Sequence, residues 1–377
     1  MSPPDAFNSF KLLITMKLRN YIFFAAICVA SVASAIKTAD LKWVDMKDYP
    51  LYGTVAKGQS VNYVRIPDSL KADMRKDLYN LAENTAGMYI RFASDASAIG
   101  AKWKSTRKFN MNHMTATGIR GMDLYTLDNG KWTTVGSARP SFNSHNTTTM
   151  VITDMEPRMR EYMMYLPLYD GIDSIYVGVD SLASVVMPRV DSPKAQKPIV
   201  MYGTSILQGG CATRPGMAHT SIISRMLDRQ VINLGFSGNA KLDMDIARLI
   251  GQTPASVIVV DALPNVKQEE LEERMRPFIA EIRKYQPVTP IIMVESPIFP
   301  LMRFNTETFA TITAKNAALR KIFDELTAAG DKNLTYYYGK DVLGDCVEGT
   351  VDNYHFTDLG FTVFANNLAP VIRALMD

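Results

Sequence analysis

The feature that most constrains the fold is a change of hydrophobic pattern across residues 187–198, a segment rich in proline, serine and lysine. After this segment, short apolar runs alternate with longer stretches of helical periodicity. We expect strands near residues 198–202, 231–234, 256–260, 290–294 and 333–338, and helices near 216–229, 241–251, 267–285, 306–329 and 358–375. This alternation predicts a parallel, doubly wound α/β sheet with right-handed crossovers, in which ligands bind beyond the carboxyl ends of the strands.

The residues before this segment follow a different pattern. Short stretches with alternating or β-branched residues are separated by Gly, Asn, Asp and Pro, which predicts an antiparallel β-sandwich or jelly roll. The clearest predicted strands are residues 61–66, 88–92, 148–152 and 174–179. Because 377 residues exceed a single core of ordinary size, we expect two domains, residues 36–190 and 196–377.

The N-terminus has the pattern of a secretory signal peptide over residues 1–35. Met16-Lys-Leu-Arg19 supplies positive charge, residues 21–32 are apolar, and Ala33-Ser-Ala35 is typical of a cleavage site. Translation that starts at Met16 fits the pattern equally. The apolar stretch is short for a membrane span, so an uncleaved anchor is the lesser alternative. We therefore expect an exported protein, periplasmic or secreted, without a stable membrane span.

Charge and cysteine usage narrow the function classes. The formal net charge is +3 without a long basic run, which argues against a nucleic-acid surface. The sequence has neither Cys-x-x-Cys nor His-Glu-x-x-His, so we expect no metal and no cofactor. An exported chain would retain Cys211 and Cys346, which form either a disulfide or two separate buried thiols.

Polar residues follow four of the five predicted strands. Ser205 comes after the first, residues 233–239 after the second, residues 261–265 after the third, and Asp352-Asn-Tyr-His355 after the fifth. Because carboxyl ends of parallel strands meet at one edge, these segments are expected to converge. Such a serine and histidine, with an aspartate three residues before the histidine, favour nucleophilic hydrolysis of an acyl group.

The chemistry assigns a role to each residue. Ser205 would be the nucleophile, His355 the general base, and Asp352 the acid that orients the imidazole. The backbone N–H groups of Ser205 and Gly238 and the side-chain amide of Asn265 would form an oxyanion hole. Each residue also has a structural reading: Ser205 and Asn265 as helix caps, Gly238 as a turn glycine, and His355 as a packed loop residue.

The same segments carry a family resemblance. The motifs are Gly121-Met-Asp-Leu-Tyr125, Gly203-Thr-Ser-Ile206, Asn233 to Gly238, Pro264-Asn265, and Asp352-x-x-His355. In this respect the chain resembles the SGNH/GDSL hydrolases, specifically an exported bacterial subgroup with a β-rich N-terminal domain. The resemblance implies a flavodoxin-like, three-layer hydrolase domain.

The resemblance also implies a Ser/Gly/Asn/His constellation, which falls on Ser205, Gly238, Asn265 and His355. Two positions depart from the family pattern: Thr204 replaces the Asp of the GDSL motif, and Phe356 stands where Pro is usual.

We therefore predict a carboxylic ester hydrolase, a serine esterase that removes O-acetyl groups from carbohydrates. Its partner would be a small-molecule or glycan ester. The first alternative is a lipid acylhydrolase or thioesterase for longer acyl chains. The second is a non-catalytic glycan-binding protein on an esterase scaffold.

Overall fold

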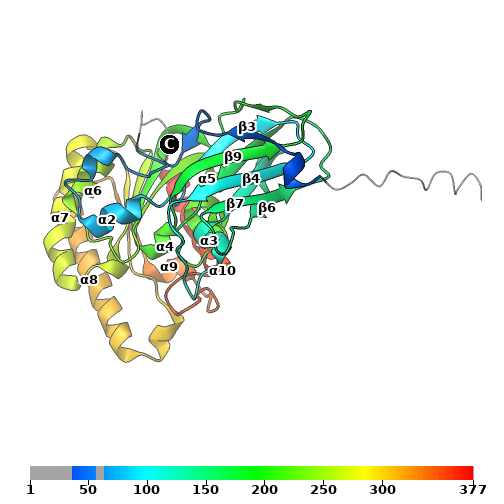
Figure 1. Cartoon of the computed structure of the whole chain (residues 1–377). Helices are drawn as coiled ribbons and strands as arrows, with labels where there is room; N and C mark the ends of the chain where they lie inside the picture. The colour runs from blue at the N-terminus through cyan, green and yellow to red at the C-terminus, as the bar shows by residue number, and fades with distance from the viewer. Residues whose placement is uncertain (1–35, 57–62, 377) are drawn as a thin grey trace, which may run out of the picture. The chain divides into compact units, whose positions relative to one another are not determined.

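The computed structural model describes residues 36–56 and 63–376 (Figure 1). The predicted signal peptide lies outside the described residues and stays a prediction. From Lys37 onward the described residues belong to one compact unit. The predicted division into residues 36–190 and 196–377 also stays a prediction. Within the described ranges, no helix is both long enough and apolar enough to cross a membrane.

A five-stranded sheet occupies the second half of the chain. Its order is β12-β11-β13-β14-β15, and every pair is parallel. The strands are β11 (Lys194–Gly203), β12 (Arg229–Gly235), β13 (Val257–Asp261), β14 (Ile291–Val294) and β15 (Leu334–Tyr337). The order reverses direction at β11, so the first strand lies inside the sheet, as in flavodoxin-like folds. The predicted parallel α/β sheet is confirmed.

Helices cover both faces of this sheet. Successive β11 residues point to opposite faces, so Val200 and Tyr202 join one core cluster while Ile199 and Met201 join the other. One face carries α6 (Met244–Gln252), α7 (Gln268–Tyr285) and α8 (Thr306–Ala328). The opposite face carries α5 (His219–Leu227), α9 (Gly339–Leu343) and α10 (Asp358–Leu375). The short α4 (Ser205–Gln208) directly follows β11.

The first half of the described chain forms two antiparallel sheets. One has the order β1-β9-β4-β7, and the other β10-β3-β8-β5-β6 with β2 beside β3. The strands are β1 (Lys42–Asp45), β2 (Leu51–Tyr52), β3 (Tyr89–Ser94), β4 (Ile99–Ser105), β5 (Met122–Asp128), β6 (Lys131–Ala138), β7 (Asn146–Ile152), β8 (Arg160–Tyr165), β9 (Ile172–Val179) and β10 (Val185–Val186). A shared core joins Ile90 and Phe92 of one sheet to Ile175 and Val177 of the other, which makes the pair a sandwich.

Two short helices lie outside the sandwich strands. These are α2 (Lys76–Ala82) and α3 (Ala116–Arg120). The segment predicted as a strand at residues 61–66 is the clear error, because its described part makes only an isolated bridge from Tyr63 to Ile172. The physical reason is Arg65, a fully buried side chain whose guanidinium donates to the carbonyls of Asn233 and Gly235 at 3.0 and 2.7 Å. The segment is thus tied to β12.

The outer face of the larger sandwich sheet packs against the parallel-sheet half. Tyr165 Oη donates to the Ser221 carbonyl at 3.3 Å, and the Arg225 guanidinium lies 4.3 Å from the centre of the Tyr125 ring. Every residue of β3 is buried because both faces of its sheet are covered. The N-terminal half therefore reaches the parallel sheet through packed side chains.

Candidate active site

Ser205 begins α4 directly after β11. At Gly203, a Cβ would lie 2.5 Å from the Asp261 carbonyl oxygen, so this strand end requires glycine for the close approach of β13. Thr204 caps the helix, with its Oγ1 accepting from the Ile206 N–H at 3.3 Å. This cap is the role of the residue that replaces the Asp of the GDSL motif. The Ser205 side chain sits at the strand's carboxyl end and is 9% exposed.

Ser205, His355 and Asp352 form a continuous hydrogen-bonded relay. His355 Nδ1 lies 2.7 Å from Asp352 Oδ2, and His355 Nε2 lies 2.9 Å from Ser205 Oγ. A carboxylate only accepts hydrogen bonds, so Nδ1 carries the proton and Nε2 accepts from the serine hydroxyl. The structure brings Ser205 to the Asp352–His355 pair, although 150 positions separate Ser205 from His355 in the sequence. Their catalytic roles stay predictions.

The aspartate is held by the backbone of its own loop. Asp352 Oδ1 accepts from the N–H groups of Tyr354 and His355 at 3.2 and 2.8 Å. Burial acts to raise the pKa of Asp352, but the hydrogen bonds and charge of His355 outweigh burial and hold that pKa below its ordinary value. The carboxylate is therefore ionised at neutral pH and suited to stabilise an imidazolium.

Packing fixes the loop where the family pattern has proline. Thr350 and Phe356 form a β-bridge that closes the loop, and the Val351 N–H donates to the His355 carbonyl at 2.8 Å. The Phe356 ring is fully buried against Phe361, with ring centres 5.5 Å apart. A buried aromatic ring thus supplies the rigidity that proline would otherwise give.

The predicted oxyanion donors occupy three neighbouring loops. The Ser205 N–H starts a helix and has no partner within it. Gly238 has φ +68°, and a Cβ there would meet nothing within 4 Å, so the space beside its α-carbon is open. Asn265 Oδ1 accepts from the Ala240 N–H at 3.3 Å, which leaves the Asn265 NH₂ group free to donate elsewhere. This arrangement suits an oxyanion hole, and that role stays a prediction.

Three contacts to the site were missed by sequence reasoning. The His113 ring lies 5.5 Å from the His355 ring, and Tyr169 Oη donates to the Ser205 carbonyl at 3.3 Å. A Cβ on Gly210 would lie 2.8 Å from Tyr169 Oη and 3.2 Å from His355 Cδ2, so this glycine permits the packing. His113 and Tyr169 come from the N-terminal half, and their local sequence carries no signal for this contact.

The motif at residues 121–125 links the two halves of the chain. Asp123 is fully buried, and its Oδ2 accepts from Arg214 Nη1 at 2.8 Å and from the Gly216 N–H at 2.9 Å. Arg214 also donates to Tyr125 Oη at 2.7 Å. Both motif side chains therefore hold the loop after α4, which indicates a structural role.

Two cavities lie beside the loops that carry the predicted site residues. One of about 400 Å³ is lined by residues that include Pro264 and Tyr354, the neighbours of Asn265 and His355. The other, of about 320 Å³, is lined by Tyr169 and by Ser237 and Asn239 on either side of Gly238. Neither lining includes Ser205, Asp352 or His355, so the two hollows border neighbouring residues of the site rather than the relay itself.

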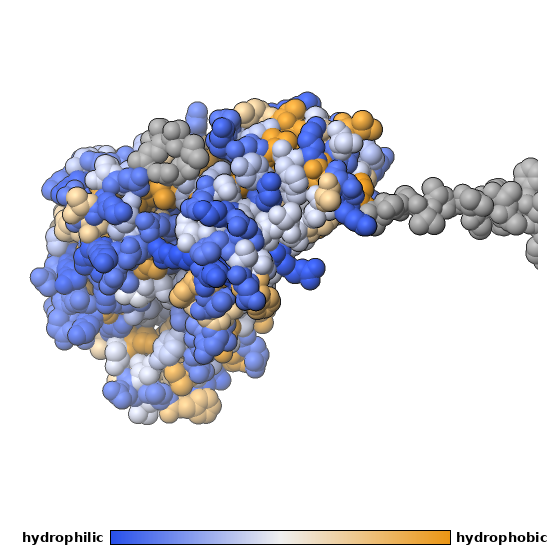
Figure 2. All heavy atoms as spheres, in the orientation of Figure 1, coloured by the Kyte–Doolittle hydropathy of each residue, from blue (hydrophilic) through white to orange (hydrophobic). Residues whose placement is uncertain are grey.

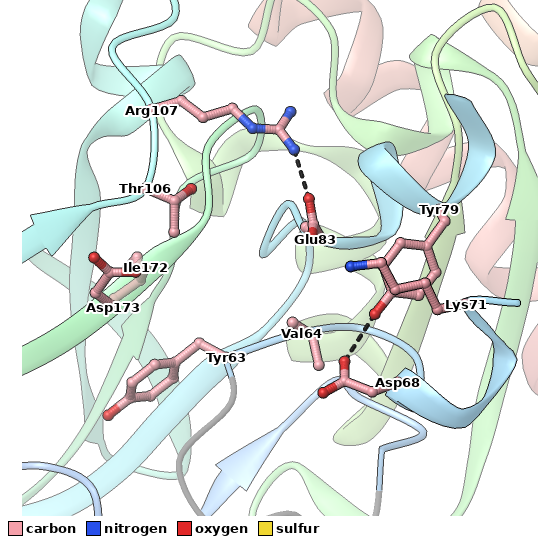
Figure 3. A pocket seen from close by; sticks show the side chains of 10 residues that line it. All are labelled: Tyr63, Val64, Asp68, Lys71, Tyr79, Glu83, Thr106, Arg107, Ile172 and Asp173. Carbon is pink, nitrogen blue, oxygen red and sulfur yellow. Dashed lines mark hydrogen bonds and ion pairs between the residues drawn. The ribbon is translucent and has the colours of Figure 1, made fainter. Parts of the chain in front are cut away.

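A larger cavity of about 550 Å³ lies in the N-terminal half, between α2 and strands β4 and β9 (Figure 3). Two pairs of its lining side chains are hydrogen-bonded: Arg107 donates to Glu83 at 2.8 Å, and Tyr79 Oη donates to Asp68 at 2.8 Å. None of the predicted catalytic residues lines it. Arg107 also lines the cavity beside Gly238, so the two hollows share one wall.

The two cysteines of the described chain are free, which corrects the disulfide alternative. Cys211 is buried, and burial raises the pKa of its thiol to about 12. Cys346 is half-buried. Cys211 instead lies with His113 and His355 in a group whose potential metal-ligand atoms are within 4.8 Å of one another. No short motif marks this group in the sequence, because its three members are distant from one another along the chain.

Comparison with known proteins agrees with the geometry. A model of the GDSL-like lipase/acylhydrolase family matches residues 196–373, and a model of the N-terminus of SGNH-hydrolase-type esterases, named GxDLY, matches residues 41–185. A solved structure described as a GDSL-like lipase from Bacteroides ovatus is 30% identical, with a TM-score of 0.84, over 89% of this chain and 98% of that one. The chain belongs to the GDSL-like lipase/acylhydrolase family.

Two more distant structures share the fold of this GDSL-like hydrolase. A salicylyl-acyltransferase from a tetracycline biosynthetic pathway is 17% identical, with a TM-score of 0.72, over 89% of this chain and 98% of that one. A family two carbohydrate esterase from Cellvibrio japonicus is 14% identical, with a TM-score of 0.56 and the same two coverages. A search of curated protein sequences found no match. Membership of the family makes this chain a hydrolase of the esterase type.

Proposed function

We propose that this GDSL-like hydrolase is an exported serine esterase that removes O-acetyl groups from carbohydrates by a Ser-His-Asp mechanism. The observation that carries the proposal is the relay of 2.9 Å from Ser205 Oγ to His355 Nε2 and 2.7 Å from His355 Nδ1 to Asp352 Oδ2. A serine hydroxyl attacks an ester at neutral pH only when a base removes its proton, and this relay places one within reach.

The mechanism follows from the donors and acceptors. Ser205 Oγ attacks the acyl carbon while His355 Nε2 takes the proton, and the Asp352 carboxylate stabilises the resulting imidazolium. The Ser205 and Gly238 N–H groups and the Asn265 amide stabilise the oxyanion. His355 then protonates the leaving alcohol, which departs and leaves the acyl group on Ser205. In the second step, His355 removes a proton from a water molecule, which attacks the acyl group and releases the acid from Ser205.

The lining of the cavity beside Tyr354 supports a small acyl group on a polar alcohol. The cavity of about 400 Å³ mixes the aromatic rings of Phe299 and Tyr354 with hydrogen-bonding groups such as Ser296, Glu307 and Thr308. A long acyl chain needs a continuous apolar groove, and polar groups interrupt the lining of this cavity. On the face of the molecule drawn in Figure 2, hydrophobic residues lie in separate patches among hydrophilic ones. A carbohydrate esterase with the same fold adds support.

Export and the two-domain division belong to the same proposal. The signal pattern of residues 1–35 supports export, and the change of pattern at residues 187–198 supports separate domains at 36–190 and 196–377. An exported enzyme meets extracellular glycans, which fits an ester of carbohydrate as substrate.

Hydrolysis of p-nitrophenyl acetate and of longer p-nitrophenyl esters, with acetate release from acetylated oligosaccharides, tests the proposal. We expect fastest turnover with acetate, and Ser205→Ala should lower kcat by roughly 10⁵- to 10⁶-fold while leaving the fold intact. Preference for long chains would replace the acetylesterase proposal with the acylhydrolase alternative. No turnover of any ester, together with sugar binding, would favour a glycan-binding protein.

A further inference from the structure

Three potential metal ligands converge at the proposed base. His113 precedes α3, Cys211 follows α4, and His355 precedes α10, and one ligand atom of each lies within 4.8 Å of the others. Imidazole and thiolate are the ligands that Zn²⁺ prefers, and a site with three protein ligands leaves a position for water. In tetrahedral coordination, such ligand atoms lie about 3.5 Å apart. Side-chain rotations that move the ligand atoms by about 1 Å would therefore let all three bind one cation.

The first histidine is already oriented for coordination. His113 Nδ1 lies 3.0 Å from Asn112 Oδ1, and an amide oxygen only accepts hydrogen bonds. His113 Nδ1 therefore carries the proton, and its Nε2 has a free lone pair. Metal-binding histidines commonly have their second ring nitrogen fixed in this way by an oxygen acceptor.

The backbone holds the cysteine in an unusual conformation. Cys211 has φ +76°, in the left-handed region that non-glycine residues rarely adopt, and it follows two glycines that would accept this region more readily. Its side chain is 5% exposed, and no residue in the described ranges forms a hydrogen bond or disulfide with the thiol. Strained residues of this kind concentrate at functional sites.

We propose that a divalent cation of the zinc class binds across His113, Cys211 and His355 and reversibly inhibits the esterase. Both ring nitrogens of His355 are engaged in the relay, Nδ1 with Asp352 and Nε2 with Ser205. A cation that coordinates either nitrogen displaces one of these bonds, so the base loses its orientation or its contact with the nucleophile. Cys211 binds as the thiolate, and its proton passes to the solvent. The inhibition, but not the binding, rests on the proposed function.

Metal binding is measured first, on the full chain freed of metal with a chelator. We expect calorimetric titration with Zn²⁺ to saturate at one ion per chain. Titration with Co²⁺ should produce a thiolate-to-metal charge-transfer band in the absorption spectrum. Cys211→Ala and His113→Gln should each weaken Zn²⁺ binding by about tenfold or more, since even partners that only orient a ligand contribute ten- to hundredfold. Cys211→Ala should also abolish the Co²⁺ band, whereas the control Cys346→Ala, which removes the other free thiol, should bind as the wild type does.

Activity is measured in parallel on p-nitrophenyl acetate, with each protein compared to its own metal-free rate. Zn²⁺ should inhibit the wild type in step with occupancy, chelator should restore the rate, and the two ligand variants should resist inhibition.

Two outcomes would overturn the metal site: a wild type without the Co²⁺ band, or ligand variants that bind Zn²⁺ as tightly as the wild type. If Cys211→Ala does not fold, the binding of Zn²⁺ to His113→Gln decides the question alone. Full activity with the site occupied would overturn the inhibition. A Co²⁺ band in a protein that hydrolyses no ester would leave the site standing and remove the proposed function instead.

Discussion

His219 should make the stability of this hydrolase depend on pH in a way that one substitution removes. The side chain lies on α5, is fully buried, and stacks on the Phe364 and Phe361 rings of α10 with ring centres 4.7 and 5.7 Å away. Neither ring nitrogen has a hydrogen-bond partner among the described residues. Burial lowers the pKa of His219 from its ordinary 6.5 to about 3.

The sign follows from the direction of this shift. Below pH 6.5 the unfolded chain binds a proton at His219 that the folded chain excludes, so acid favours unfolding. The stability that depends on a neutral His219 is fully present above pH 6.5 and is lost progressively as pH falls toward 3. A pH of 5 lies about 1.5 units below the ordinary pKa of 6.5 that the unfolded chain retains. This interval corresponds to a loss of about 2 kcal/mol of the free energy of unfolding.

Urea unfolding at pH 7.5 and pH 5, followed by circular dichroism, measures this contribution. His219→Phe keeps an aromatic ring in the stack but cannot bind a proton. The loss of unfolding free energy between the two pH values should therefore be about 2 kcal/mol smaller in His219→Phe than in the wild type. The comparison cancels carboxylates that titrate in both proteins, and His145→Gln, on the sandwich, controls for the removal of a histidine. Equal losses in wild type and His219→Phe would refute the assignment of a buried, neutral imidazole.

Two further substitutions test the relay and the link between the halves of the chain. Asp352→Asn should lower kcat on p-nitrophenyl acetate by roughly 10⁴-fold, because an amide facing His355 Nδ1 favours the wrong tautomer; a loss below tenfold would show that the aspartate does not orient the base. Asp123→Asn should lower the free energy of unfolding by about 3 kcal/mol, because Arg214 loses its buried partner; urea denaturation checks this, and an unchanged midpoint would show that the ion pair does not hold the loop.

The sequence predicts the parallel sheet well because local periodicity carries the necessary information. Runs such as residues 257–260 are buried on both faces of a sheet and leave an unmistakable apolar pattern. Once the strands are parallel, Ser205 and His355 must lie at the same edge, so their convergence follows from topology rather than from any contact visible in the sequence. The strand predicted at residues 61–66 was wrong because the pattern does not reveal that Arg65 is anchored to a distant segment. In the sequence, Arg65 looks like an ordinary polar residue of a strand.

Local sequence patterns do not reveal which distant segments pack beside the loops at the carboxyl edge of the parallel sheet. His113 and Tyr169 reach the proposed catalytic residues from the sandwich half, yet neither lies in a motif. The cavity of about 320 Å³ beside Gly238 is lined from both halves, with Phe109 and Tyr169 on one side and Ser237 on the other. The proposed bond-breaking chemistry needs only loops of the parallel sheet, whereas the shape offered to a substrate depends on the sandwich half. Enzymes of this family that share the relay can therefore differ in substrate through residues that no catalytic motif contains.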